Sequence, residues 1–250
     1  MTLDVRWLWV FLEHEGRAAE ADAWWAERLR STISPRRGES GQFATFLPAA
    51  GDPWVKTQTV GVLGPGAGTH LDLDVPDPQA AAAVAVTLGA RITAGLEGSG
   101  YVALLSPGGY PFCMTTASRE RTQVLEGEVP DVLDQLCLDL PQERVAAEIG
   151  FWEALTGWQW VQSEVAEYGY FRRPEGMPLR ILTQRLGEQD GSVRGHVDLA
   201  CRSVPVTRAA HLAAGARLVA DRGFWSHLRD PWGRDYCLTG RWPGTAWVGA

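Results

Sequence analysis

Residues 70–73 read His-Leu-Asp-Leu, and residues 196–199, 126 positions further along, read His-Val-Asp-Leu. With the same spacing, Thr-Gln-Thr-Val-Gly at 57–61 returns as Thr-Gln-Arg-Leu-Gly at 183–187. Three further pairs keep this order while the register drifts by at most three residues: 23–27 with 150–154, 89–91 with 215–217, and 107–115 with 231–239. Five matches in one order indicate a tandem duplication of about 126 residues.

Each copy contains the same order of elements twice, one strand, one helix and three strands. In the second copy the hydrophobic spacing predicts helices over 142–155 and 206–214. Alternation predicts strands over 135–140, 158–165, 168–172, 179–186, 195–200, 217–220, 224–229 and 235–239. The first copy has corresponding helices over 18–29 and 78–88. The chain is therefore expected to contain four βαβββ modules.

The domain boundaries follow from the repeat. We expect a first domain over residues 1–118, a linker over 119–130, a second domain over 131–243 and a tail over 244–250. The linker is rich in charge and ends in Pro130, which is typical of a connector.

Composition excludes several classes of protein. Of 250 residues, 45% are hydrophobic, and 30 acidic against 23 basic side chains give a net charge of −7. That balance favours a folded chain and disfavours nucleic acid as a partner, since phosphate would be repelled. The longest apolar run has seven residues, 80–86, and no export signal is evident, so we expect a cytoplasmic protein without a membrane partner. Four widely spaced cysteines predict free thiols.

Some of these repeated segments also carry a family likeness. They are the helix end over 151–158, the His-x-Asp-Leu strand, the Leu-Gly-Ala helix terminus at 88–90, and the Asp-Pro-x-Gly turn at 230–233. In this order, twice over, the chain resembles the vicinal-oxygen-chelate superfamily of glyoxalases, bleomycin-resistance proteins and extradiol dioxygenases. Within it, the two-copy bacterial glyoxalase-like domain proteins are most similar. The resemblance implies an α+β fold in which tandem glyoxalase-like domains form two cupped mixed sheets, each around a cavity.

The resemblance also implies where a metal would bind, because metal-using members place one ligand on the first and last strand of each module. His70 and His196 are the histidines expected at two of these positions. Cys113 and Cys237 stand where a carboxylate is expected. Gln58 and Gln184 are the nearest candidates on the last strand of the first modules, and the first strands, 7–12 and 135–139, supply no histidine. We therefore predict no catalytic metal, with a divalent ion as the alternative.

Each histidine has an aspartate two positions along its strand, so their side chains point to the same face. His70 with Asp72, and His196 with Asp198, are therefore candidate catalytic pairs, in which the carboxylate orients the imidazole as a general base. The alternative is a structural role, with each aspartate bonded to a neighbouring loop or strand.

The function remains open between three predictions. The first is a metal-independent lyase, isomerase or cyclase that uses the His-Asp pairs on a small, aromatic or apolar molecule. The second is a non-catalytic or drug-sequestering binder, and the third is a metal-dependent glyoxalase or dioxygenase. The chain has twelve tryptophans, and we expect Trp158 and Trp225 to line a ligand cavity together with the glutamines and cysteines above. A monomer or a homodimer is expected, because two copies in one chain can form a pseudo-dimer.

Overall fold

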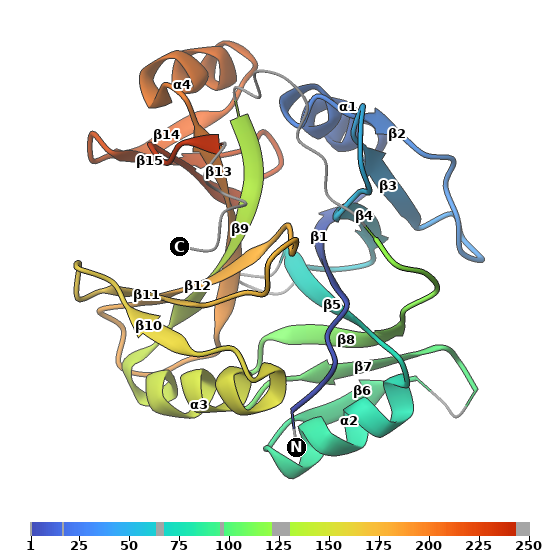
Figure 1. The fold of residues 1–250 in the computed structure, drawn as a ribbon. Coiled ribbons are helices and arrows are strands. Elements are labelled where there is room, and N and C mark those ends of the chain that lie inside the picture. The colour runs from blue at the N-terminus through green and yellow to red at the C-terminus, as the bar shows by residue number, and fades with distance from the viewer. Residues whose placement is uncertain (1, 17, 64–67, 96–97, 122–130, 244–250) are drawn as a thin grey trace.

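The computed structural model describes residues 2–16, 18–63, 68–95, 98–121 and 131–243, and it contains two mixed eight-stranded sheets, one from each copy (Figure 1). Neither sheet closes into a barrel, and helices cover part of one face of each, so the α+β expectation is confirmed. Among the described residues, no helix is both long and apolar enough to cross a bilayer.

The first sheet has the strand order β2-β3-β4-β1-β5-β8-β7-β6. Its elements are β1 (Trp7–Glu15), α1 (Ala18–Arg28), β2 (Thr32–Ile33), β3 (Phe43–Leu47), β4 (Val55–Val60), β5 (Thr69–Val75), α2 (Pro78–Thr87), β6 (Arg91–Ala94), β7 (Tyr101–Leu105) and β8 (Pro111–Thr116).

The second sheet has the matching order β10-β11-β12-β9-β13-β16-β15-β14. Its elements are β9 (Asp131–Leu140), a 3₁₀ turn (Gln142–Arg144), α3 (Val145–Thr156), β10 (Trp160–Gln162), β11 (Tyr168–Phe171), β12 (Arg180–Arg185), β13 (Arg194–Cys201), α4 (Val204–Ala213), β14 (Arg217–Asp221), β15 (Trp225–Arg229) and β16 (Asp235–Thr239).

The predicted elements are present, and the differences lie at their ends. Strand β1 was expected to end at Leu12, but it continues to Glu15 because β4 still pairs with it there, after β5 has separated. The helix expected over 142–155 starts as a 3₁₀ turn after Pro141 and ends at Gly157, whose positive φ of 74° closes it, as predicted.

The register of the central strands separates a polar face from an apolar one. In the first sheet, Phe11 lies opposite His70 and Trp9 lies opposite Asp72. Leu71 and the other intervening residues point to the opposite face, because side chains alternate along a strand. In the second sheet, Cys137 lies opposite His196 in the same way.

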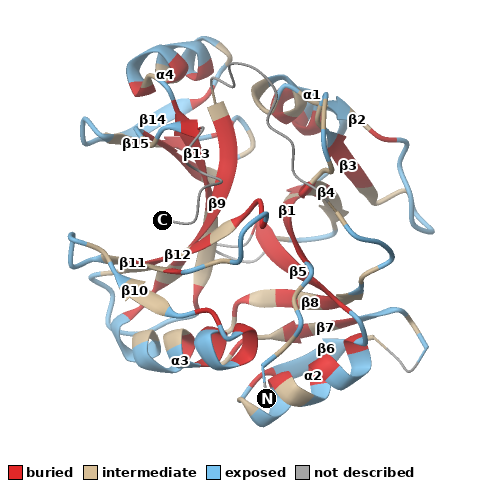
Figure 2. Ribbon diagram, viewed as in Figure 1, coloured by how far each residue is buried: buried red, intermediate tan, exposed pale blue. Residues whose placement is uncertain are grey.

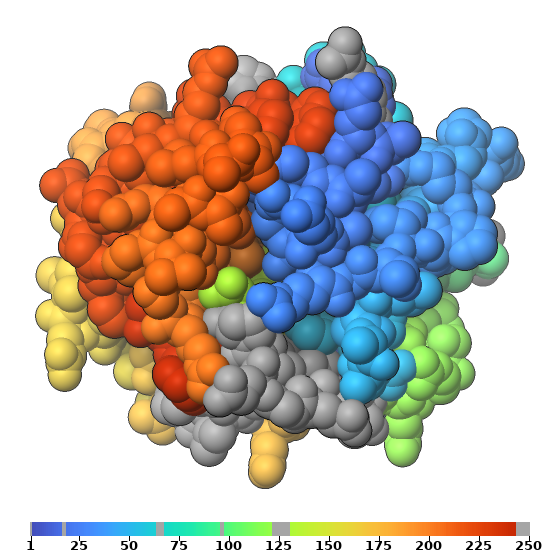
Figure 3. Space-filling model, turned by 90° about the horizontal axis from the view of Figure 1, so that it is seen from above, coloured from blue at the N-terminus to red at the C-terminus, as the bar shows by residue number. Residues whose placement is uncertain are grey.

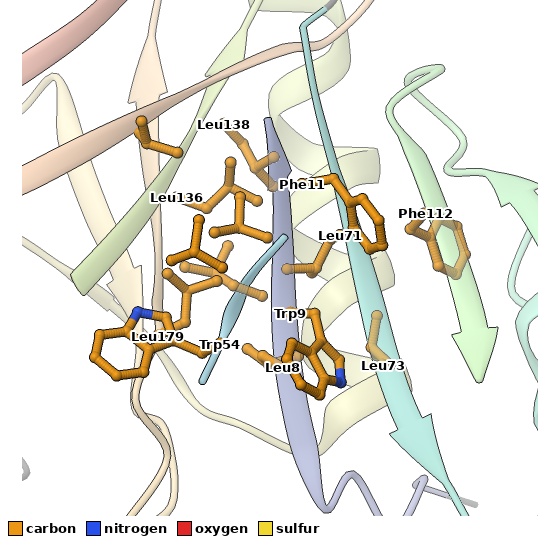
Figure 4. Packing of buried hydrophobic residues seen from close by; sticks show 14 of the residues in the cluster. Leu8, Trp9, Phe11, Trp54, Leu71, Leu73, Phe112, Leu136, Leu138 and Leu179 are labelled. Carbon is orange, nitrogen blue, oxygen red and sulfur yellow. The ribbon is translucent and has the colours of Figure 1, made fainter. Parts of the chain in front are cut away.

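The two apolar faces pack against each other and form the core (Figures 2 and 4). Leu8 and Leu71 of the first sheet gather there with Leu136 and Leu138 of the second, and all four are fully buried. The Trp54 indole bridges the sheets by donating to the Leu133 carbonyl at 2.8 Å. The polar faces therefore point away from this shared core.

The first helix of each copy packs on the other copy. From α1, the Trp24 indole donates to the Ala214 carbonyl at 2.8 Å and the Trp25 indole to Asp230 Oδ2 at 3.0 Å. Figure 3 shows the blue segment around α1 against the orange segment around α4. From α3, buried Glu148 accepts from the backbone N–H of Gly108 at 2.8 Å and from the Trp152 indole at 2.9 Å. Each copy thus contributes one helix that packs on the other copy.

Gly108→Ala tests this contact between the two copies. A Cβ at Gly108 would lie 2.4 Å from Val193 Cγ2 and 2.7 Å from Glu148 Oε2, so one partner must move. We expect the free energy of unfolding in urea to fall by about 1–3 kcal/mol. Gly61→Ala is the control, because no atom lies within 4 Å of its added Cβ. Equal unfolding midpoints for the two variants would contradict the packing described here.

Candidate functional site

The polar face of each sheet forms a cavity, which we call cup one in the first copy and cup two in the second. Cup one has a volume of about 740 Å³. Its lining includes four of the residues predicted for the site: Gln58, His70, Asp72 and Cys113. Cup two has a volume of about 830 Å³. Its lining includes five: Gln184, His196, Asp198, Trp225 and Cys237.

In cup one the imidazole of His70 lies between two carboxylates. Nδ1 is 2.8 Å from Glu13 Oε1, and Nε2 is 3.5 Å from Asp72 Oδ1. The ring stacks on Phe11, with centroids 4.1 Å apart. Burial alone would lower the pKa of His70, but the hydrogen bonds and charges of Asp72 and Glu13 outweigh it and raise the pKa to about 9. The imidazole is therefore held as a cation at neutral pH.

Lys56 neutralises the nearby aspartate. Its ammonium lies 3.4 Å from Asp72 Oδ2 and 4.1 Å from the centroid of the Trp9 ring. Burial would raise the pKa of Asp72, yet His70 and Lys56 hold it below its usual value. Burial and the Asp72 charge raise the pKa of the Cys113 thiol, which therefore stays protonated.

Cup two repeats the arrangement around His196. Nδ1 lies 2.9 Å from Asp139 Oδ2, and Nε2 lies 3.4 Å from Asp198 Oδ1. Burial would lower the pKa of His196, but Asp139 and the neighbouring thiols Cys137 and Cys237 raise it well above its usual value. Unlike Asp72, Asp198 has a raised pKa, because burial outweighs the attraction of His196 and the Arg241 guanidinium.

Cup two has no lysine beside its aspartate. Instead, a neutral glutamine connects Asp198 to an arginine. The Gln135 amide donates to Asp198 Oδ2 at 2.9 Å, and Arg180 Nε donates to Gln135 Oε1 at 2.5 Å. Position 182, which matches Lys56 in the repeat, is a leucine, so no ammonium reaches Asp198. Arg241 is paired through both Nη atoms with Asp134.

The first-strand carboxylates Glu13 and Asp139 are the site residues that the sequence analysis missed. They are separated by the repeat distance of 126, and each follows the inward-facing residue of its strand by two positions. That spacing could have identified both carboxylates as site residues. The sequence analysis missed them because β1 was expected to end at Leu12, and because a histidine was expected on these strands.

Trp158 is the predicted ligand-binding residue that does not reach a cup. Its side chain is buried in the hydrophobic core just after α3 and is not among the residues that line cup two. Tyr168, Phe224 and Trp225 form the aromatic wall instead.

Both cups contain side chains that could hold a metal ion, so the prediction of no metal is not supported. Ligand atoms lie within 4.8 Å of one another in three groups: His70, Asp72 and Cys113; His196, Asp198 and Cys237; and Cys137, Asp139 and His196. Cup one fits poorly, because the Lys56 ammonium already occupies the cation position beside Asp72. In both cups one aspartate oxygen, Asp72 Oδ1 or Asp198 Oδ1, is buried without a hydrogen-bond partner among the described residues. Because no lysine lies beside Asp198, and because the Cys237 thiol is close to it, cup two fits an ion such as zinc that accepts sulfur, nitrogen and oxygen ligands.

Comparison with known proteins places this geometry in context. The sequence profile of the glyoxalase-like domain matches residues 9–115 and again residues 135–239. No curated protein matches the chain in sequence. Several solved structures share the fold, at identities too low to establish a reaction.

The Mn(II)-bound glyoxalase from Novosphingobium aromaticivorans has a TM-score of 0.61 and 14% identity, over 95% of this chain and 82% of its own. An extradiol ring-cleaving dioxygenase from B. fuscum has a TM-score of 0.64 and 14% identity, over 96% and 73%. A xylose isomerase-like TIM barrel/4-hydroxyphenylpyruvate dioxygenase fusion protein has a TM-score of 0.60 and 14% identity over 95% of this chain, which spans 49% of the fusion protein.

The two profile matches follow the repeat found in the sequence, and each falls on one cupped sheet. The chain therefore belongs to the glyoxalase-like domain family, with two such domains in tandem.

Proposed function

We propose that the chain is an enzyme of the isomerase or lyase type that binds a small carbonyl compound in a cup. It removes a proton from the carbon next to the carbonyl group and donates a proton to the carbonyl oxygen. One observation carries the proposal, the imidazole held between two carboxylates at each cavity wall. His70 lies between Glu13 and Asp72, and His196 lies between Asp139 and Asp198. Structural ion pairs need no cavity, whereas Glu13, His70 and Asp72 line cup one, and His196 and Asp198 line cup two.

The raised pKa of the imidazole changes the role that the sequence suggested for it. A cationic histidine is a proton donor, so in this proposal His196 donates from Nε2 to the substrate oxygen. Asp198 Oδ1, which has no hydrogen-bond partner among the described residues, accepts the proton from the adjacent carbon. For an α-hydroxy carbonyl compound, transfer of that proton from Asp198 to the former carbonyl carbon, while the hydroxyl on the adjacent carbon gives its proton to His196, completes an isomerisation.

Cup two suits this reaction better than cup one. The raised pKa of Asp198 makes it the stronger base, whereas Lys56 and His70 lower the pKa of Asp72. Asp139, bonded to the opposite nitrogen of His196, fixes the orientation of the ring.

A second candidate function is a metal-dependent reaction in the same cup. The cluster of His196, Asp198 and Cys237 favours it, because their ligand atoms lie within 4.8 Å of one another. A bound ion would supply Lewis-acid polarisation of a substrate oxygen. A glyoxalase of this fold is a Mn(II)-bound protein, although a thiol ligand favours softer ions than manganese.

The first prediction tests proton transfer without knowledge of the natural substrate. We expect the wild-type chain to catalyse exchange of the carbon-bound hydrogen of an α-hydroxy ketone or an aryl ketone with D2O, followed by proton NMR. His196→Gln and Asp198→Asn should reduce the rate by about 10²-fold or more, the usual contribution of acid–base groups. His227→Gln, which changes a histidine outside both cavity linings, is the control. Unchanged exchange in both cup variants would contradict the proposal, and ligand binding without any exchange would favour a non-catalytic binder.

The second prediction concerns the charge of His70, which Glu13, Asp72, Lys56 and Cys113 surround. Because its pKa is raised in the folded state, its stabilising contribution is complete below about pH 6.5, the unfolded value, and is lost as the pH rises through about 9. NMR of the imidazoles should show His70 titrating near pH 9. His211, whose pKa is lowered to about 4 by burial, should not titrate between pH 6 and 10.

The same titration has a thermodynamic counterpart. The stability difference between the wild type and His70→Gln should be largest near pH 6 and should shrink towards pH 10. A pH-independent difference, with His70 titrating near its ordinary value, would show that the carboxylates do not hold the ring as a cation.

The third prediction tests the second candidate function. The purified chain titrated with Co²⁺ should develop a thiolate-to-cobalt charge-transfer band in the near ultraviolet, which Zn²⁺ then displaces. Cys137→Ser and Cys237→Ser together should abolish the band, because both thiols beside His196 are then lost from cup two. Cys113→Ser should retain it, because Lys56 opposes an ion in cup one. Absence of the band from the wild type would leave the metal-independent reaction as the better account.

A further inference from the structure

The two cups differ in the charge of their walls. Cup two is lined by more cationic than anionic groups: Arg180, His196, Arg222 and Arg241 against Glu167 and Asp198. In cup one the two kinds are equal in number: Arg37, Lys56 and His70 against Glu13, Glu39 and Asp72. Arg241 is paired with Asp134 and His196 with Asp139, both outside the lining, so the excess of positive charge in cup two rests on Arg180 and Arg222.

Arg180 is the centre of this difference. Its Nε donates to the neutral side chain of Gln135 at 2.5 Å, and its guanidinium lies 4.8 Å from the centroid of the Tyr170 ring. In the part of the chain that the structure describes, no carboxylate lies within ion-pair distance of Arg180, and neither Nη atom has a hydrogen-bond partner. Arg241, also in the lining, is by contrast committed to Asp134.

The position of Arg180 is also costly for a charge without a counter-ion. The side chain is half-buried, and burial together with the nearby Arg241 lowers its pKa. A guanidinium presents five donors in a fixed fork that matches a carboxylate bidentately. The groups that hold Arg180 in place, Gln135 and Tyr170, leave most of those donors for a ligand.

The rest of cup two fits the body of such a ligand. Leu182 and Val165 contribute apolar surface, and Tyr168, Phe224 and Trp225 contribute aromatic surface. The cavity, at about 830 Å³, lies within the range of sites for small organic molecules. Through Gln135, Arg180 is also joined to Asp198, so a group bound to Arg180 lies close to the proposed base.

We infer that cup two binds an organic carboxylate with an aromatic or apolar body, and that Arg180 receives its carboxylate group. This inference rests on the proposed function, since it names the class of substrate that the His196–Asp198 pair would act on. In the first copy a tryptophan, Trp54, stands at the position of Arg180, so cup one has no equivalent donor.

The experiment compares matched ligands that differ in charge alone. Phenylacetate and phenylacetamide, and 4-hydroxybenzoate and its amide, are titrated into the full chain and followed by calorimetry and by the imidazole NMR signal of His196. We expect the better carboxylate to bind at least tenfold more tightly than its amide. Arg180→Gln should remove that preference. Lys56→Gln, which deletes one positive charge from cup one, should keep it.

Each outcome bears on the inference. Equal affinity for acid and amide, no detectable binding of either carboxylate, or a preference that survives in Arg180→Gln would overturn it. Failure of the proposed function is separate, because it appears as carboxylate binding that depends on Arg180 without any exchange catalysed by His196. If hydrogen exchange is equally fast for neutral and carboxylate-bearing ketones and is unchanged in Arg180→Gln, the proposed reaction is supported and the preference for a carboxylate is contradicted.

Discussion

Within each copy, the first strands of the two modules pair antiparallel, β1 with β5 and β9 with β13. This pairing determines which side chains meet in the cup. Because Phe11 faces His70 across β1 and β5, the next inward-facing residue, Glu13, lies diagonally beside the imidazole. Asp139 reaches His196 in the same way across β9 and β13. A slip of β5 by one residue would turn His70 and Asp72 into the apolar core, and Leu71 would point into the cavity in their place. The packing of the two apolar faces thus secures the register on which the site depends.

Burial of these charges is expensive, and each cup offsets it differently. A buried imidazolium between two carboxylates leaves one excess negative charge. In cup one, Lys56 supplies the missing cation and is covered by Trp9, so the cluster is nearly neutral and closed. In cup two, the neutral side chain of Gln135 bonds to Asp198 and the cation is one residue further away, on Arg180. The pKa of Asp198 is raised, whereas that of Asp72 is lowered.

The repeat made most of the fold predictable, because duplicated anchors in a fixed order define the modules without reference to side-chain contacts. The inward face of His70 and Asp72 followed from alternation alone. Glu13 was lost because a strand end depends on which neighbour still pairs with it, which no local pattern records. Trp158 lies in the core rather than in the lining of cup two, which alternation along a strand could not show, because β10 begins only at Trp160. No sequence pattern indicated Arg180, because its distinguishing feature is that no carboxylate of the described residues lies within ion-pair distance of it.

The exchange of helices explains why two unlike cups persist in one chain. The apolar face of each sheet packs against that of the other, and part of it is covered by the first helix of the other copy, through Trp25 on Asp230 in one direction and Glu148 on Gly108 in the other. A single copy would leave a large apolar face exposed to water, at roughly 25 cal/mol for each Å². Neither copy can therefore be lost without exposing the apolar surface of the other. Cup one is free to close around its lysine while it still supports the scaffold that holds His196, Asp198 and Arg180 in register.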